Sequence, residues 1–550
     1  MPSLRSTGLG LPLLTCALLA ASCSAPVVAI DVTIVTKACA GATNNGADLG
    51  HDPSVGVDTL RLTLSGDGLS TQTVTAPFGD GTLTVPNVPL GTNRRVVVEA
   101  LKNTLVRARA DSGLFDALDG STVQLSLFLR VIDSFTFTTG VDTTTCSKMV
   151  YPRAGHAMTL LGDGRVLITG GYTIQNDGLH YLNQAEVYDP KTGLFSAQVA
   201  SPSFRRGGHA ALAVQLGAAG TGVIIAGGEG PSDPVSGSGN TVAIKPLELF
   251  NTNVWQQITP PGTSPTRTHQ SAAVDLRKGF VVIAGGLSGP DVPGAVALDG
   301  VSWFDPQQTI VKDSSQPLAA PLADAVAVAR ANKPVSGSAR GGVVLVGGRD
   351  ANGAASAQVS GVVFNDAQNQ YIPDATWEAP ALNHLPSPRV RHVGARTKSD
   401  SVVIAGGAST VSSTDPYANT VSLITVLEPD ALQPYIEDTT ARLSQARADS
   451  CGVALNDGTF LVAGGATKLS GVNTTVSATD LISPDGRDTT VRLPRGPNSA
   501  MDGGLQMPRH RAACVRLLDG SVLITGGLQY GAAGAIPATL DSAEIFMPAQ

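Results

Sequence analysis

The sequence predicts an all-β protein, with an immunoglobulin-like β-sandwich near its N-terminus and a seven-bladed β-propeller after it. Three observations lead to this prediction. The chain has 550 residues, more than one ordinary hydrophobic core holds. Charged residues make up only 15% of it and glycine occurs 62 times. This composition favours strands and turns over helices with many surface salt bridges. A short pattern also recurs seven times in its second part, as expected of a repeat architecture.

Residues 1–22 predict a bacterial lipoprotein signal peptide. Arg5 precedes an apolar run of about a dozen residues, and small residues ending in AASC follow it. The AASC stretch resembles a lipobox, which implies lipidation of Cys23, although Ala20 stands where leucine is usual. We expect residues 23–30 to form a tether and the protein to be an outer-membrane lipoprotein of the cell envelope, facing the periplasm or the surface. Plain secretion is the alternative.

Residues 31–132 predict the β-sandwich. Short segments such as DTLRLTLSG and STVQLSLFLRV alternate apolar and polar residues, and Gly, Pro, Asn and Asp separate them. About seven such strands in about 100 residues are typical of an antiparallel sandwich. The Cys, Trp and Cys of antibody domains are missing. Residues 133–150 are expected to link this domain to the propeller of residues 151–550.

Seven glycine pairs punctuate the second part of the chain, each after a short β-branched run such as VLITGG or VVIAGG. The pairs begin 57 to 62 residues apart. Asp163-Gly164 and its counterparts lie between the two apolar runs of a repeat and predict two-residue hairpin turns. The pairs are Gly170-Gly171, Gly227-Gly228, Gly285-Gly286, Gly347-Gly348, Gly406-Gly407, Gly464-Gly465 and Gly526-Gly527.

Each repeat predicts four short strands, and seven such repeats predict a closed ring of blades. The last repeat ends after its third strand. A ring without an open edge then needs a strand from elsewhere. We expect the segment SFTFTT, residues 134–139, to supply it.

The repeats resemble the Kelch family. The resemblance covers about residues 150–550 and rests on the glycine pair, on a Tyr or Phe in strand three, and on the motif PR..H ahead of strand one, as in Pro152-Arg153 with His156. Blade four lacks the Arg and His, and the family's strand-four Trp is clear only at Trp255. The resemblance implies a propeller, and the whole arrangement resembles surface lipoproteins of Gram-negative bacteria.

Four cysteines remain beyond the signal region, an even number that suits an oxidising compartment. Cys39–Cys146 would join the two predicted domains. Cys451 and Cys514 occupy strand one of blades six and seven with a one-residue offset, which turns them to opposite faces. Opposite faces of adjacent blades pack together, so these two could form a second disulfide. Two buried thiols are the alternative for this pair.

The recurring histidines and glycines raise two chemical alternatives. His156, His209 and His392 could be imagined as a ring of metal ligands, but equivalent positions in different blades lie apart, so we expect packing and hydrogen bonding. The neighbouring arginines are expected to reach backbone carbonyls or Glu186, Glu248 or Glu544. No Lys-Ser or Lys-Thr follows the glycine pairs, so they are not phosphate loops.

No enzyme class has a clear motif in this sequence. Copper-radical oxidases share a Kelch-like ring but use two Tyr, two His and a Cys joined to a Tyr, and no such pattern occurs here. No metal or other cofactor is expected. The net charge of −7 and the pI of about 5.6 show no excess of positive charge of the kind that binds nucleic acid.

The loops after the glycine pairs are the predicted binding surface, because loops on a rigid scaffold carry function. Their ring-bearing side chains are Tyr172, His180, Tyr181, Tyr417 and Tyr530. The sequence therefore favours a lipid-anchored scaffold that binds an unknown protein or glycan. The alternatives are a propeller enzyme, such as a lyase or hydrolase, and a structural envelope protein. Convergence of His and carboxylates at the ring axis would favour the enzyme.

Overall fold

The computed structural model is all-β, and it describes most of the chain's residues. These are 27–36, 39, 53, 56–78, 88–118, 122–141, 145–198, 200–234, 236–292, 295–330, 333–335, 338–378, 383–398, 400–412, 415–428, 435–484, 489–494, 503–532 and 534–549. The predicted signal peptide and Cys23 lie outside them. Within them, no helix combines the length and apolar character needed to cross a membrane.

The N-terminal domain consists of two sheets that share one apolar core. One sheet has the order β4-β1-β8 and the other the order β3-β2-β5-β6-β9, with β7 paired to β5. Leu62 and Val96 of the larger sheet and Leu127 of the smaller one belong to the same buried cluster. The strands are β1 (Val27–Val35), β2 (Thr59–Gly66), β3 (Leu69–Pro77), β4 (Val88–Pro89), β5 (Gly91–Lys102), β6 (Leu105–Asp111), β7 (Phe115–Ala117), β8 (Thr122–Phe128) and β9 (Arg130–Val131).

Seven four-stranded sheets form the blades of a β-propeller, as the repeats predict. Blades one to four contain, in sheet order, β11 (Ala157–Leu160), β12 (Val166–Thr169), β15 (Ala185–Asp189) and β16 (Leu194–Ala197); β17 (Ala210–Gln215), β18 (Thr221–Ala226), β21 (Leu247–Asn251) and β22 (Val254–Ile258); β23 (Ser271–Val274), β24 (Val281–Ala284), β25 (Val301–Asp305) and β26 (Ile310–Asp313); β27 (Val326–Ala329), β30 (Val343–Val346), β31 (Val359–Asn365) and β32 (Gln370–Pro373).

Blades five to seven follow the same order, and β10 supplies the outer strand of blade seven. Their strands are β33 (Val393–Arg396), β34 (Val402–Ala405), β35 (Leu423–Glu428) and β36 (Tyr435–Arg442); β37 (Cys451–Ala454), β38 (Phe460–Ala463), β41 (Thr479–Ser483) and β42 (Thr490–Arg492); β43 (Ala513–Arg516), β44 (Val522–Thr525), β47 (Ala543–Met547) and β10 (Ser134–Phe137).

The predicted closing segment therefore completes the ring. β10 pairs antiparallel with β47, from Ser134 opposite Met547 to Phe137 opposite Glu544. The ring centroids of Phe135 and Phe546 lie 5.0 Å apart in a cluster that also holds residues of blade six. The segment just ahead of blade one and the last strand of the propeller thus share one blade, which removes an open sheet edge.

The second strand of each blade carries the propeller core. In six of the seven blades, all four residues of this strand are buried. Such runs are apolar throughout because adjacent blades cover both faces. Buried clusters accordingly span neighbouring blades; one contains Val282 of blade three and Leu345 of blade four.

Both predicted disulfides are present. Cys39–Cys146 joins the chain ahead of β2 to the chain ahead of blade one, with Cα atoms 4.8 Å apart. Cys451–Cys514 joins strand one of blades six and seven, with Cα atoms 6.0 Å apart. Facing sides of adjacent blades do bring this second pair together.

The prediction of two-residue turns was wrong. The Leu161 N–H donates to Arg165 O and the Gly164 N–H donates to Leu161 O, so the loop between β11 and β12 is longer. Only the glycine adopts a left-handed conformation, with φ of 88° at Gly164. The Asp163 carboxylate instead accepts the Arg165 N–H, which is the usual aspartate role in a turn.

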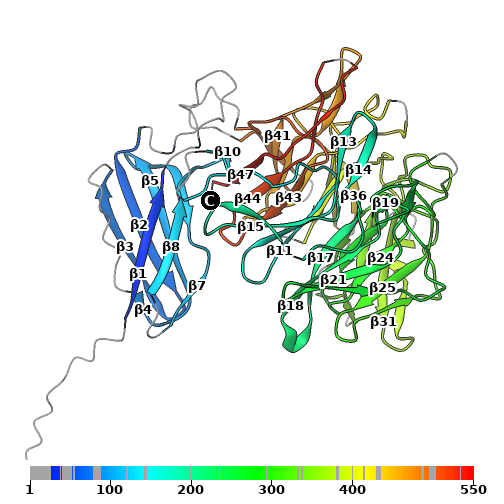
Figure 1. Ribbon diagram of the computed structural model, residues 1–550, viewed down its shortest axis with the longest axis horizontal. Helices are drawn as coiled ribbons and strands as arrows, with labels where there is room; N and C mark the ends of the chain where they lie inside the picture. Colours follow the sequence, from blue (N-terminus) through cyan, green and yellow to red (C-terminus); the bar gives the residue numbers. More distant parts are fainter. Residues whose placement is uncertain are drawn as a thin grey trace, which may run out of the picture.

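Five short hairpins project from the blades. Four of them follow glycine pairs and lie on one side of the ring, where β13 and β14 are visible in Figure 1. These are β13 (Tyr172–Gln175) with β14 (Gly178–Tyr181), β19 (Glu229–Pro231) with β20 (Thr241–Ala243), β39 (Ala466–Leu469) with β40 (Val472–Thr475), and β45 (Leu528–Gln529) with β46 (Ala538–Thr539). The fifth, β28 (Lys333–Val335) with β29 (Ser338–Arg340), joins β27 to β30, and short 3₁₀ turns occur at Gly217–Ala219 and Ala375–Glu378.

The N-terminal domain lies beside blades one and seven (Figure 1), against the ends of their strands opposite those hairpins. It contacts the loops around Gly164 and Leu518, each between strands one and two of a blade. The hairpin side of the ring is therefore left uncovered by this domain.

Candidate functional site

One position recurs at the start of every blade in a left-handed conformation; it lies two residues after the repeated arginine in every blade except blade four, which has Leu322 in place of the arginine. We call its seven residues the axial ring. Their φ angles lie between 52° and 63°. The ring consists, from blade one to blade seven, of Gly155, Gly208, His269, Asp324, Arg391, Asp449 and Arg511.

Backbone hydrogen bonds link the axial ring into two arcs. The Asp324 N–H donates to His269 O at 2.8 Å, which forms the shorter arc. The longer arc runs through blades five, six, seven, one and two, and each bond in it joins the N–H of one axial residue to the carbonyl of the preceding one. Among the described residues, no such bond joins Gly208 to His269 or Asp324 to Arg391.

The conformation of the axial ring is costly for its side chains. Glycine adopts positive φ freely, whereas other L-residues lose about 1–2 kcal/mol there, with Asp, Asn and His tolerating it best. Blades one and two use glycine, but five blades place ionisable residues at this position. Strain of this kind concentrates at functional sites.

A second set of residues, which directly follow the glycine pairs, surrounds the axial ring. Each forms an isolated β-bridge with the residue preceding the axial position, as Ala323 does with Arg349. The set contains Tyr172, Glu229, Leu287, Arg349, Ala408, Ala466 and Leu528. Sequence variation at these two positions decides the chemistry of the axis, because the blade framework around them is constant.

All seven axial residues line one cavity of about 430 Å³ at the ring axis, which we call the axial mouth. Tyr172, Glu229 and Arg349 of the second set line it too, together with Asp291 from the loop of blade three. The axial mouth therefore gathers three arginines, two histidines (His269 and His392) and four carboxylates within one small space.

His269 and Asp324 form a dyad on one side of the axial mouth. His269 Nδ1 lies 2.5 Å from Asp324 Oδ1, while Nε2 lies 3.9 Å from Asp291 Oδ2, beyond hydrogen-bond distance. Burial opposes a charge on the imidazole, but the charge and hydrogen bond of Asp324 raise the pKa of His269 above its ordinary value. Asp324 therefore favours the protonated form of this imidazole.

Arg349 holds the two carboxylates of the dyad side in place. Its Nη1 and Nη2 donate to the two oxygens of Asp291 at 2.6 and 2.8 Å, and its Nε donates to Asp324. Burial opposes ionisation of Asp324, yet His269 and Arg349 keep its pKa well below the usual range. Asp324 thus stays ionised and orients the imidazole through Nδ1, which leaves Nε2 for a ligand.

Arginines dominate the other side of the axial mouth. Arg511 donates through Nη1 to Tyr172 Oη at 2.9 Å and through Nε to Asp449 at 3.2 Å. Tyr417 Oη donates to Asp449 Oδ2 at 2.6 Å. Burial opposes the charge of Asp449, but Arg511 and Arg391 hold its pKa at about 2.

The structure places the five predicted loop residues in different settings. Tyr172 lines the axial mouth, and Tyr181 donates to Glu229 Oε1 at 3.0 Å. Tyr417 is buried against Asp449, and Tyr530 stacks on His510 with ring centroids 4.9 Å apart. His180 is exposed at a hairpin and pairs with Asp177. Three of these five residues thus support the axial mouth rather than face solvent.

The repeated histidines bind neighbouring blades together, as expected. His156 Nε2 lies 2.8 Å from Thr525 of blade seven, and His392 Nε2 donates to Val346 O of blade four at 3.0 Å. Burial lowers the pKa of His209 and of His392 to about 3, so these side chains are neutral. Their environment is that of a structural hydrogen bond.

The repeated arginines form buried ion pairs with strand-three carboxylates, also as expected. Arg153–Glu186, Arg206–Glu248 and Arg509–Glu544 have nitrogen–oxygen distances of 2.6, 2.9 and 2.7 Å. Each arginine also donates to the carbonyl of the first glycine of its pair. The glycines themselves allow the next blade to approach: a Cβ at Gly170 would lie 2.4 Å from Arg206 O. They mark the blade corners.

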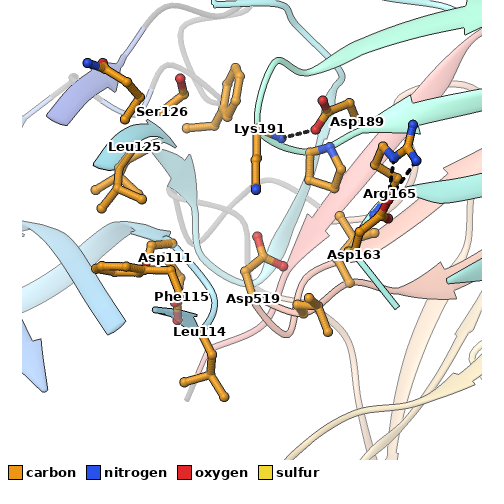
Figure 2. Close-up of a pocket in the computed structure, with 18 of the residues that line it drawn as sticks. Asp111, Leu114, Phe115, Leu125, Ser126, Asp163, Arg165, Asp189, Lys191 and Asp519 are labelled. Carbon is orange, nitrogen blue, oxygen red and sulfur yellow. Dashed lines mark hydrogen bonds and ion pairs between the residues drawn. The ribbon is translucent and has the colours of Figure 1, made fainter. Parts of the chain in front are cut away.

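A second cavity, of about 530 Å³, separates the N-terminal domain from blades one and seven (Figure 2). Leu114, Phe115 and Leu125 line one side. Lys191 and Asp519, from loops of blades one and seven, point toward one another across it in Figure 2. Its side chains include no dyad or set of strained residues like that of the axial mouth, so we assign the functional site to the axial mouth.

Many solved structures, including the following two, are similar to this chain. One is YjhT, with a TM-score of 0.43, 16% identity, and coverage of 63% of this chain and 99% of that chain. The other is a fungal alcohol oxidase of the AA5 family in complex with copper, with a TM-score of 0.49, 14% identity, and coverage of 72% and 75%. No protein-family profile and no curated protein matches the chain.

The residues of this chain do not fit a copper-radical centre. Such a centre uses a cysteine joined to a tyrosine, whereas both propeller cysteines, Cys451 and Cys514, are joined to each other. Within the described ranges, no three His, Cys, Asp or Glu side chains are grouped to hold a metal ion. The axial mouth instead pairs each of its acids with arginine, tyrosine or histidine.

Proposed function

We propose that this protein is an enzyme of the cell envelope that acts on a small polar ligand by proton transfer in the axial mouth. The lyase and hydrolase classes fit this chemistry. His269 is the proton-transfer residue, Asp324 orients it, and Arg349 fixes Asp324. The axial mouth is open on the hairpin side, where a ligand can enter.

The observation that carries the proposal is the axial ring itself. Five ionisable side chains are held in the left-handed conformation at a position where two blades use glycine. A purely structural ring would favour glycine throughout, because glycine adopts this conformation without strain. Placing His269 next to Asp324 in this way assembles a dyad whose imidazole keeps one nitrogen for a ligand.

The proposed step is a reversible proton transfer. A C–H or O–H bond of the ligand breaks, its proton passes to Nε2 of neutral His269, and the electron pair stays on the ligand. The Asp324 carboxylate stabilises the imidazolium that forms. The imidazolium then returns its proton to the product or to a leaving group, which restores the neutral histidine.

The proposed location is the bacterial envelope, through lipidation of Cys23 in the predicted lipobox. Two disulfides, Cys39–Cys146 and Cys451–Cys514, suit an oxidising compartment. The N-terminal domain packs against the propeller ends opposite the hairpins. An anchor on that domain would leave the axial mouth directed away from the membrane.

A binding scaffold for a protein or glycan is the second candidate, and the hairpin turns favour it. Leu179, Leu469, Val472 and Ile536 lie in the hairpins or loops of blades one, six and seven and are between 43% and 49% exposed. Apolar side chains at such places are suited to contact with a partner. This candidate predicts binding without turnover.

The deciding experiment incubates the lipid-free mature protein with a panel of uronic and hydroxy acids in D₂O. Proton NMR follows loss of C–H signals and new products. The proposal predicts turnover or hydrogen exchange that falls by at least about 100-fold in His269→Gln and Asp324→Asn, since general base catalysis contributes about this much. The matched control, His384→Gln, changes an exposed histidine and should leave the rate unchanged. Equal rates in all four proteins would refute the role of the dyad.

A further inference from the structure

Arg391 differs from the other two arginines of the axial mouth in having no acidic partner. Arg349 is held by Asp291 and Asp324, and Arg511 by Asp449. Among the described residues, the Arg391 guanidinium forms no hydrogen bond and no ion pair, and its Nη1 is buried without a partner. Removing a guanidinium from water without giving it a partner destabilises the protein. A bound anion would offset that cost.

The surroundings of Arg391 fix its guanidinium in place. Its Cζ lies 5.9 Å from the centre of the Tyr417 ring, a cation–π distance. Tyr417 is itself fixed because its hydroxyl donates to Asp449. Asp449 also accepts from Arg511, so this carboxylate is already occupied and does not neutralise Arg391 at hydrogen-bond distance.

From these contacts we infer that Arg391 binds the carboxylate of the ligand in the axial mouth, and that the ligand is a small hydroxylated monocarboxylate such as a sugar acid. This inference rests on the proposed function for the location of the ligand. A guanidinium presents parallel N–H donors that match a planar carboxylate. Arg391 also follows Asp324 in the axial ring, so a ligand held by Arg391 lies beside the dyad.

The charges of the axial mouth favour a monoanion over a dianion. Arg349 and Arg511 are matched by acids, and Asp291, Asp324 and Asp449 are ionised beside them. Only Arg391 remains without an anionic partner, so it can neutralise one negative charge. A phosphate dianion would bring a second charge toward the four carboxylates that line the axial mouth, which costs free energy in a partly buried site.

Two further polar groups of the axial mouth, Tyr172 and Glu229, suit ligand hydroxyls. Tyr172 Oη accepts a hydrogen bond from Arg511, so its own hydrogen is free to donate. Glu229 accepts from Tyr181 through Oε1 and lines the axial mouth. A carboxylate with neighbouring hydroxyls would therefore find donors and acceptors together here.

The test measures binding of three probes to the lipid-free mature protein by calorimetry: D-glucuronate, its neutral counterpart glucose, and inorganic phosphate. The inference predicts that glucuronate binds at least about tenfold more tightly than either of the others, and that Arg391→Gln removes this preference, since charged hydrogen bonds contribute about this much. Arg391→Lys keeps the positive charge, so this variant should retain part of the preference for glucuronate. The matched control is Arg165→Gln, an exposed arginine on the opposite face of the propeller.

His269→Gln separates this inference from the proposed function. Binding of glucuronate that persists in His269→Gln while turnover is absent from every protein would support the anion site and refute the enzyme. Equal binding of glucose and glucuronate, or a preference for glucuronate unchanged in Arg391→Gln, would overturn the inference. Tighter binding of phosphate would overturn its restriction to a monoanion.

Discussion

Replacing His392 by glutamine should make the propeller markedly less sensitive to acid. His392 donates through Nε2 to Val346 O, the residue before the glycine pair of blade four. Blade three performs the same task with Gln270, whose Nε2 donates to Ala226 O at 2.9 Å. His392→Gln therefore keeps the hydrogen bond between blades and removes only the titration.

The magnitude follows from the depressed pKa of His392. Burial lowers this pKa to about 3, while an unfolded chain has an ordinary value of about 6.5. Below about pH 6.5 the unfolded state binds the additional proton, so the free energy of unfolding falls as the pH falls. Each pH unit costs about 1.4 kcal/mol, and the loss between pH 6 and pH 4 is about 2.5 kcal/mol from this residue.

Urea unfolding at both pH values, followed by tryptophan fluorescence, measures this loss. Trp255, Trp303 and Trp377 all lie in blades two to four, so the signal reports on the propeller. We expect the wild-type protein to lose about 2.5 kcal/mol more than His392→Gln between pH 6 and pH 4. Equal losses in the two proteins would refute the argument that this histidine is buried and neutral.

Three further predictions concern the ring and its axis. Phe135→Ala should lower the free energy of unfolding by about 3–5 kcal/mol in urea, because this fully buried side chain fastens the closing strand to Phe546; a change below about 1 kcal/mol would contradict that role. Arg391→Gly should raise the free energy of unfolding by about 1 kcal/mol, because glycine adopts the left-handed conformation without strain. Arg391→Ala retains the strain and should not raise it. An equal change in the free energy of unfolding of both variants would exclude strain as the cause. Breaking the disulfide with Cys39→Ser and Cys146→Ser, 107 residues apart, should lower stability by up to about 4–5 kcal/mol, and an unchanged melting temperature would count against it.

The framework of the propeller was predictable because the same sequence pattern recurs in its seven blades. Seven glycine pairs predict seven blades, and the missing last strand predicts a donor, which is β10. The buried pair of Arg153 and Glu186 could also be foreseen, because an arginine recurs ahead of strand one and an acid recurs in strand three. Such features repeat since every blade meets the same packing problem.

The axial mouth could not be predicted from the same repetition. Its residues occupy one position between the repeated Arg and His, but their chemistry differs from blade to blade, from Gly155 to His269 to Arg391. In blade four, which lacks the repeated Arg, only the left-handed backbone shows that Asp324 is the equivalent residue. Tyr181 and Tyr417 were predicted as ligand-binding candidates because they lie in polar loops after the glycine pairs. The structure buries both side chains, and their hydroxyls donate to Glu229 and Asp449.

The titration of His269 by NMR of ¹³C-labelled histidines, assigned with His269→Gln, tests the central claim most directly. We expect a pKa of His269 above the ordinary value of about 6.5, a fall in that pKa in Asp324→Asn, and a shift of the His269 signal when glucuronate is added. A pKa at or below the ordinary value that neither the substitution nor glucuronate changes would contradict the assignment of the axial mouth as the functional site.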